Sequence, residues 1–391
     1  MSSRVTMRSL HIYPRKERVF PFQDTQPVPV FKERKPIAKR HVLRQIYMYV
    51  YMIHIAANAV AGSIHTKSMM YLIETMTHTL RIIVATVTTT YSLVKRDSID
   101  RIAKDLQSFE GPVPEELLAK SRRKLKYLRL SALLYCVLLI VTTALFFVLV
   151  PAQKYFDKNF YRIDLESAGI SMIWAILIGL VEWNSYNCIA TATPLLIASY
   201  VVLCDNLRIQ MLDFRAFQRA ALESGPMTVE KLGKIQVKCA NLLDMERRLE
   251  ALFAPAVSLW IGDLLVNIVL PIRTLVNGIA SFTVANVMSF FIEVVYSVCF
   301  FLILSFSLAD IEDEYREIEE ELFRLRNAVP VDDWQLCQQV ILLQSGITSS
   351  TFTLTGWGLF EVDRSFILTI VGAVATYTVI LVQLTPGEEN Y

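Results

Sequence analysis

The chain has 391 residues, of which 53% are hydrophobic and only 19% are charged, and its mean hydropathy is +0.40. That balance is too apolar for an ordinary soluble domain and indicates a membrane protein. The net charge of +2 conceals a segregation of basic residues along the chain and points to no nucleic-acid partner. A membrane enzyme is the least favoured class, because the five histidines all lie in the first fifth of the chain without metal-ligand spacing, and no phosphate loop or nucleophile motif is present. No cofactor is expected.

Seven apolar stretches reach the length of about 20 residues that a helix needs to cross a bilayer. They lie at about residues 43–63, 70–95, 127–150, 169–205, 255–279, 284–308 and 364–385. The sequence therefore predicts an all-α membrane protein with seven transmembrane helices, embedded in a lipid bilayer. The fourth and fifth stretches are longer than a bilayer requires, so we expect both to continue into the cytoplasm as helical extensions.

Lysine and arginine mark one side of the membrane. Both are dense before the first stretch, after the second and after the fourth, whereas the intervening loops hold only Lys67, then Lys154, Lys158 and Arg162, and then Arg273. By the positive-inside rule, the N-terminus is cytoplasmic and the C-terminus is extracellular. A G-protein-coupled receptor would need the opposite orientation, and the chain has neither an Asp-Arg-Tyr motif after the third stretch nor an Asn-Pro-x-x-Tyr motif in the seventh.

This topology divides the chain into four parts. Residues 1–42 form a cytoplasmic N-terminal arm, and residues 43–308 form a six-helix transmembrane bundle with cytoplasmic loop helices at about 206–254. Residues 309–363 form cytoplasmic anchor helices, and residues 364–391 form a seventh helix with a short extracellular tail.

Two soluble segments carry helical stripes of apolar residues. The first, at 228–253, places Leu232, Ile235, Cys239, Leu242, Leu249 and Leu252 on one face and continues into the fifth stretch. The second, Ser307–Asn327, repeats Ile311, Tyr315, Ile318, Leu322 and Leu325 between acidic residues. Asp332 or Asp333 can then cap a further helix, Trp334–Gly346. These stripes either pack on neighbouring helices or join copies of the protein below the membrane.

The most specific motifs stand near the end of the chain. Residues 356–365 run Gly-Trp-Gly-Leu-Phe-Glu-Val-Asp-Arg-Ser, and Thr376-Tyr377 is followed by five largely apolar residues and then by Gln383-Leu384. This tail resembles the C-terminal signature of arthropod gustatory receptors, a Thr-Tyr dipeptide, five hydrophobic residues and Gln-Phe, with Leu384 in place of the Phe. Residues 358–365 are similar to the Gly-Phe-Phe-x-x-Asp-Arg-Ser run that precedes the last helix of that family.

The resemblance implies a ligand-gated, non-selective cation channel in the plasma membrane of a sensory neuron. It implies a small-molecule tastant, a homotetramer or a heteromer with sister receptors, and a central pore made by the last helix of each copy. The cytoplasmic extensions would form a shared anchor.

On the last helix, Tyr377, Ile380 and Leu384 recur on one face, and Gln383 lies beside them. If this helix lines a pore, rings of Ile380 and Leu384 would form a hydrophobic gate, and the Gln383 amide would turn into the lumen when the gate opens. The alternative is that this face packs as ordinary core. The face carries no acidic residue, so cation preference would have to come from Glu388, Glu389 or the acidic run at 312–321.

Several polar and aromatic residues are out of place for lipid in the predicted spans. The candidate ligand-binding set is Glu74, His78, Arg81, Trp174, Glu182, Trp183, Asp263, Asn267 and Glu293. An Arg or Asp at mid-membrane costs about 2.5–3.5 kcal/mol on the insertion scale, so these residues should pair or line a wet cavity. A Glu74–Arg81 or Asp263–Arg81 pair would simply hold the bundle together. Alternatively, the set lines an extracellular-facing pocket among helices two to six, where Trp rings beside acids suit sugars and also bitter alkaloids.

A secondary transporter, or another kind of seven-span receptor, is the main competing interpretation, because charged residues within the membrane can also relay substrates. Transporters usually show internal repeats or paired broken helices. No repeat is evident in this chain, and Pro194 and Pro271 are isolated.

Overall fold

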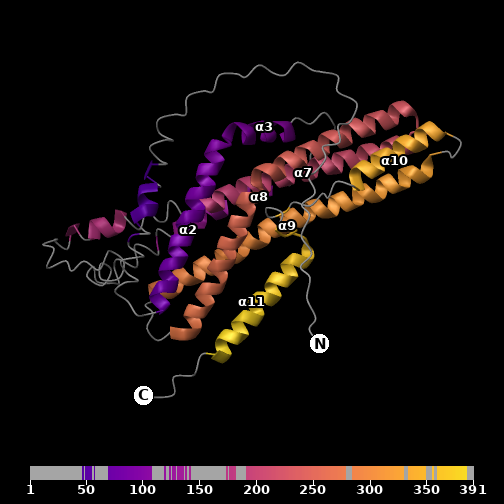
Figure 1. Cartoon of the computed structure of the whole chain (residues 1–391). Coiled ribbons are helices and arrows are strands. Elements are labelled where there is room, and N and C mark those ends of the chain that lie inside the picture. The colour runs from indigo at the N-terminus through magenta and orange to yellow at the C-terminus, as the bar shows by residue number, and fades with distance from the viewer. Residues whose placement is uncertain are drawn as a thin grey trace, which may run out of the picture. The chain divides into compact units, whose positions relative to one another are not determined.

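The computed structural model describes residues 69–107, 191–278, 284–329, 333–348, 355 and 359–384, together with scattered helical positions at 46–57, 119–141 and 173–181. Over these residues the protein is helical and contains no strand beyond an isolated bridge between Thr355 and Glu361. The labelled helices are α2 (Met69–Val94), α3 (Arg96–Gln107), α7 (Ala192–Glu223), α8 (Val229–Gly278), α9 (Val284–Ala328), α10 (Trp334–Thr348) and α11 (Arg364–Leu384) (Figure 1).

Three described helices are long and apolar enough to cross a membrane, over Ala192–Glu223, Val229–Val269 and Phe291–Arg326. Shorter apolar helices lie at Thr79–Val94 and Arg364–Ile380. The all-helical membrane fold agrees with the sequence prediction. Most of the predicted first and third spans falls outside the described residues, so the number of spans and the orientation of the termini stay predictions.

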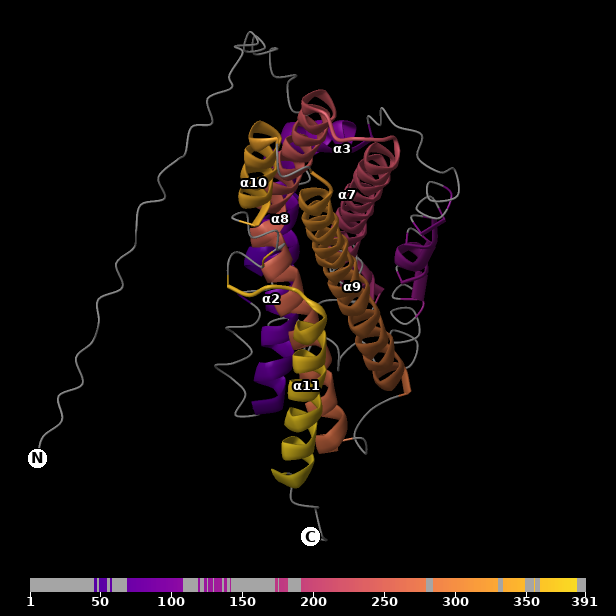
Figure 2. The same ribbon diagram turned by 90° about the vertical axis from the view of Figure 1, so that its right-hand side faces the viewer.

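The long helices α7, α8 and α9 contact one another along their length and form the centre of the fold. The short helices α3 and α10 lie at one end of this group, whereas α2 and α11 lie along the other end (Figures 1 and 2). The apolar segments of α8 and α9 continue without a break into charged segments, as predicted for 228–253 and for 307–327. Pro255 therefore lies inside α8 and does not end it.

Local sequence explains where these helices begin and end. Gly225 has φ of 105°, a left-handed conformation that favours glycine, and it lets the chain turn from α7 into α8. The Thr228 hydroxyl accepts a hydrogen bond from the Lys231 N–H at 3.3 Å and caps α8. At α10, the Asp333 carboxylate accepts from the Leu336 N–H at 3.1 Å, which confirms the predicted cap.

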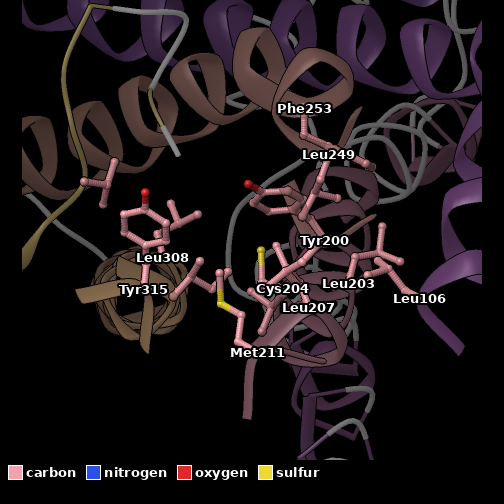
Figure 3. Packing of buried hydrophobic residues seen from close by; sticks show 14 of the residues in the cluster. Leu106, Tyr200, Leu203, Cys204, Leu207, Met211, Leu249, Phe253, Leu308 and Tyr315 are labelled. Atoms are coloured by element: carbon pink, nitrogen blue, oxygen red, sulfur yellow. The ribbon is translucent and has the colours of Figure 1, made fainter. Parts of the chain in front are cut away.

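Both apolar stripes predicted from the sequence are buried inside the single chain. Ile311, Ile318, Leu322 and Leu325 are all 1% exposed, and Leu232, Ile235 and Leu249 are fully buried. Figure 3 shows this layer, where Leu207 and Met211 of α7 lie near Leu249 of α8 and near Leu308 and Tyr315 of α9. The stripes therefore pack on neighbouring helices of the same chain, and any contact between copies must use other faces.

A ladder of ion pairs joins α7 to α9 beyond their apolar segments. Arg208 donates to Asp310 at 2.6 Å and to Glu314 at 3.1 Å. Arg215 donates to Glu314 at 2.7 Å, lies 3.6 Å from Glu321, and also pairs with Glu317. The next arginine on α7, Arg219, pairs with Glu321 as well. Much of the acidic run at 312–321 is therefore neutralised within the chain and is a poor source of cation attraction.

Candidate functional site

A buried arginine links three helices near the middle of their apolar segments. The Arg81 guanidinium, on α2, donates to Glu293 Oε1 of α9 at 3.0 Å and to Asn267 Oδ1 of α8 at 2.6 Å. Arg81 is only 5% exposed, so its charge is held by these partners rather than by water. Among the described contacts its ion-pair partner is Glu293; the predicted Glu74–Arg81 pair involves a side chain outside the described residues and stays a prediction.

Asp263 lies one turn before Asn267 on α8 and is also 5% exposed. Its Oδ1 atom has no hydrogen-bond partner among the residues that the structure describes. The same holds for two neighbouring donors, the Trp260 indole N–H and the Thr193 hydroxyl. Buried polar atoms are nearly always hydrogen-bonded, so three such atoms on adjacent helices indicate a place that accepts a polar group.

These polar residues line a small cavity of about 10 Å³. Its walls are formed by Arg81, Tyr135, Thr193, Pro194, Ile197, Asp263, Leu264, Asn267, Tyr296 and Ser297. The rings of Tyr135 and Tyr296 stack there with centroids 3.6 Å apart. A cavity of this size holds about one water-sized group.

The structure brings together four members of the predicted ligand-binding set: Arg81, Asp263, Asn267 and Glu293. Glu74 and His78 lie in α2, but their side chains fall outside the described part of the chain, as do Glu182 and Trp183 altogether.

Trp174 belongs to a different place. It lines a separate, largely apolar cavity of about 370 Å³ together with Tyr47, Tyr51, His54, Leu177, Ile178 and Val181. This cavity differs from the one that Asp263 borders, and the predicted part of Trp174 in ligand binding stays a prediction. The sequence prediction missed Thr193 and Tyr135, since one hydroxyl or one ring in an apolar span carries no distinctive pattern.

The start of α11 is fixed to the rest of the chain at several points. The Asp363 carboxylate caps the helix by accepting from the Phe366 N–H at 2.6 Å. Arg364 pairs with Asp313 of α9 at 2.5 Å, and the Phe366 ring stacks on Phe360 at 5.1 Å. The Asp-Arg-Ser run therefore connects the start of α11 to α9.

Further along α11, one face packs on the chain and the other does not. Phe366, Ile370 and Val374 pack against the core formed with α8 and α9. Other residues of the helix are exposed in the single chain: Leu368, Val371, Val379, Ile380 and Gln383. Of the predicted pore residues, Tyr377 is half-buried and the Leu384 side chain is outside the described residues. The predicted stripe thus lies at the border between the packed and the open face.

Comparisons with known proteins agree with this architecture. The chain matches the model of the 7tm chemosensory receptor family over residues 21–385. It is similar to the insect olfactory receptor OR5 from Machilis hrabei in complex with eugenol, with a TM-score of 0.73 at 14% identity over 92% of this chain and 93% of that chain. Another structure of the same receptor gives a TM-score of 0.64 at 12% identity with the same coverage. None of the curated proteins matches the chain.

The fold and the site define a helical membrane protein with a buried polar cluster between its helices and a last helix that leaves one face open. The chain belongs to the 7tm chemosensory receptor family, which matches nearly its whole length.

Proposed function

We propose that this protein is a gustatory receptor that acts as a ligand-gated, non-selective cation channel, with α11 lining the pore. The observation that carries the proposal is the open face of α11. This helix is apolar along its length, yet its unpacked face presents the amide of Gln383. An amide facing acyl chains would leave its hydrogen bonds unsatisfied at a cost of several kcal/mol, so the face is expected to meet protein or water.

Several copies around one axis satisfy this requirement. If α11 of each copy faces the axis, Gln383 meets water or the next copy, and Ile380 lies where a hydrophobic ring can close the pore by dewetting. We propose a tetramer, made of this chain alone or with sister receptors. Since much of the acidic run on α9 is paired with α7, cations would be attracted by Glu388 and Glu389 of the tail.

The ligand site is proposed at the cluster of Arg81, Asp263, Asn267 and Glu293. It joins α2, α8 and α9, so a ligand bound there contacts helices that also support α11. The similar olfactory receptor was solved with eugenol, a small molecule, which supports a small-molecule ligand for this chain. We expect the tastant to come from the extracellular side and to be a sugar or a bitter compound, of which one polar group enters the small cavity at the cluster.

Current recordings from cells that express the protein alone test the proposal. A tastant panel is expected to evoke cation currents, and Gln383→Ala is expected to change ion permeation or open probability at equal surface expression. Val374→Ala is the control, because Val374 lies on the face of α11 that packs against the core of the same chain. Ligand-evoked currents that are untouched by substitutions at Gln383, Ile380 and Leu384 would show that the pore lies elsewhere.

A further inference from the structure

Among the side chains of the polar cluster that the structure describes, acidic groups outnumber basic ones. Among the described side chains that meet there, Arg81 carries the positive charge, whereas Asp263 and Glu293 are both acids. Arg81 is engaged by Glu293, with guanidinium nitrogens 3.0 and 3.5 Å from the two carboxylate oxygens. The Arg81–Glu293 pair is close to neutral, which leaves the Asp263 carboxylate as the excess charge.

Asp263 is only partly satisfied by its surroundings, because Asn267 and the charge of Arg81 interact with it but one of its oxygens is left over. It is buried, its Oδ1 atom has no partner in the described part of the chain, and it borders the cavity of about 10 Å³. An isolated carboxylate in a medium of low polarity is strongly disfavoured unless a cation or a donor meets it. The volume suits a group the size of a water molecule, and an ammonium head is of that size.

Aromatic rings surround the same point. Tyr135 and Tyr296 line the cavity, and Trp260, which is fully buried, stands one turn before Leu264 of the cavity wall. Aromatic rings attract cations, and this attraction is larger where water is excluded. A carboxylate at a cavity that two tyrosine rings also line is therefore a chemical environment that favours an organic cation over a neutral or anionic group.

We propose that this cavity binds the protonated amino group of an organic amine, with Asp263 as its counter-ion. The inference rests on the proposed function, since it names the class of ligand for the same site. A hydroxyl group satisfies the Oδ1 hydrogen bond but leaves the excess negative charge uncompensated. An ammonium group donates the hydrogen bond and also supplies a positive charge. The ammonium head fills the cavity and also donates to the Thr193 hydroxyl, whose oxygen has no partner in the described part of the chain.

Thermal unfolding of the purified full chain in detergent tests this assignment. The probes are 2-phenylethylamine with the isosteric 2-phenylethanol, and methylammonium chloride with potassium chloride at equal ionic strength. We expect at least one amine to raise Tm above its matched control. We also expect Asp263→Asn to abolish that difference, while Asp105→Asn, an exposed position on α3, leaves it unchanged.

The outcomes separate clearly. Equal stabilisation by each amine and its control in the wild-type protein overturns the proposal, whatever the variants do. So does an amine effect that persists in Asp263→Asn. If the cavity holds only a water molecule, Asp263→Asn raises the baseline Tm and no amine differs from its control.

Current recordings distinguish failure of this inference from failure of the channel proposal. If amines gate the channel through Asp263, the Asp263→Asn variant needs at least about tenfold more amine for a half-maximal current. Currents evoked by alcohols and not by amines leave the channel in place and refute the amine site. Amine-dependent stabilisation without any current supports the site and refutes the channel.

Discussion

Arg215 occupies the centre of the ion-pair ladder between α7 and α9, and its removal gives a quantitative test of that contact. Its side chain is only 12% exposed and faces the buried carboxylates of Glu314 and Glu321. Removing one partner from a buried ionic group costs about 3–5 kcal/mol. Both carboxylates keep one other arginine, Arg208 or Arg219, so we expect Arg215→Met to cost about 3 kcal/mol, at the low end of that range.

The assay is thermal unfolding of the purified protein in detergent, where a loss of this size lowers Tm by about 5 °C. The matched control is Arg316→Met, whose side chain is 65% exposed and pairs with Glu312 one turn away. Exposed pairs of this kind contribute about 0.5 kcal/mol or less. If both variants unfold at the same temperature, the buried ladder contributes no more than a surface pair, and the reasoning is refuted.

Two further substitutions test the ion pair that links α9 to α11 and the titration of the Glu246 carboxyl group on α8. Arg364→Asp breaks the pair with Asp313 and is expected to shift the ligand concentration that gives a half-maximal current. Adding Asp313→Arg swaps the charges and should restore the wild-type concentration. Failure of the swap would show that the pair does not couple the helices. Glu246 lies before the apolar segment of α8, and burial, aided by the charge of Glu250, raises its pKa to about 8. The native state therefore holds a proton that the unfolded state releases above about pH 4.5, so stability falls as pH rises from about 4.5 to 8. Glu246→Gln should flatten this fall in Tm measured at pH 5, 6.5 and 8.5, and parallel pH profiles for both proteins would contradict the assignment.

Local pattern was enough to predict the helices outside the membrane and their ends. The apolar stripe before Pro255 continues in phase into the next apolar segment, and α8 runs unbroken across the proline. Asp333 stands at the predicted position that caps α10. The structure adds a similar cap at Asp363 for α11, which was not predicted. Such features depend on neighbours within one or two turns, which the sequence displays directly.

Partners across the fold could not be predicted in the same way. Arg81 pairs with Glu293, which is 212 positions away, and several acids of equal chemistry lay in the predicted spans. Which acid faces the arginine depends on the rotation and height of each helix in the bundle, and spacing along one helix does not encode either. For the same reason, spacing along the chain did not indicate that Trp174 shares a cavity with Tyr47 and Tyr51.

The continuity of α8 has a mechanical consequence. At 1.5 Å per residue its 50 residues follow a helical path about 75 Å long, of which a bilayer covers only about 30 Å. A tilt of about 3° around a pivot in the lipid displaces the far end, about 45 Å away, by about 2 Å, which is the size of shift that separates functional states at many protein interfaces. One continuous helix thus connects small rearrangements around the cavity to larger movements outside the membrane.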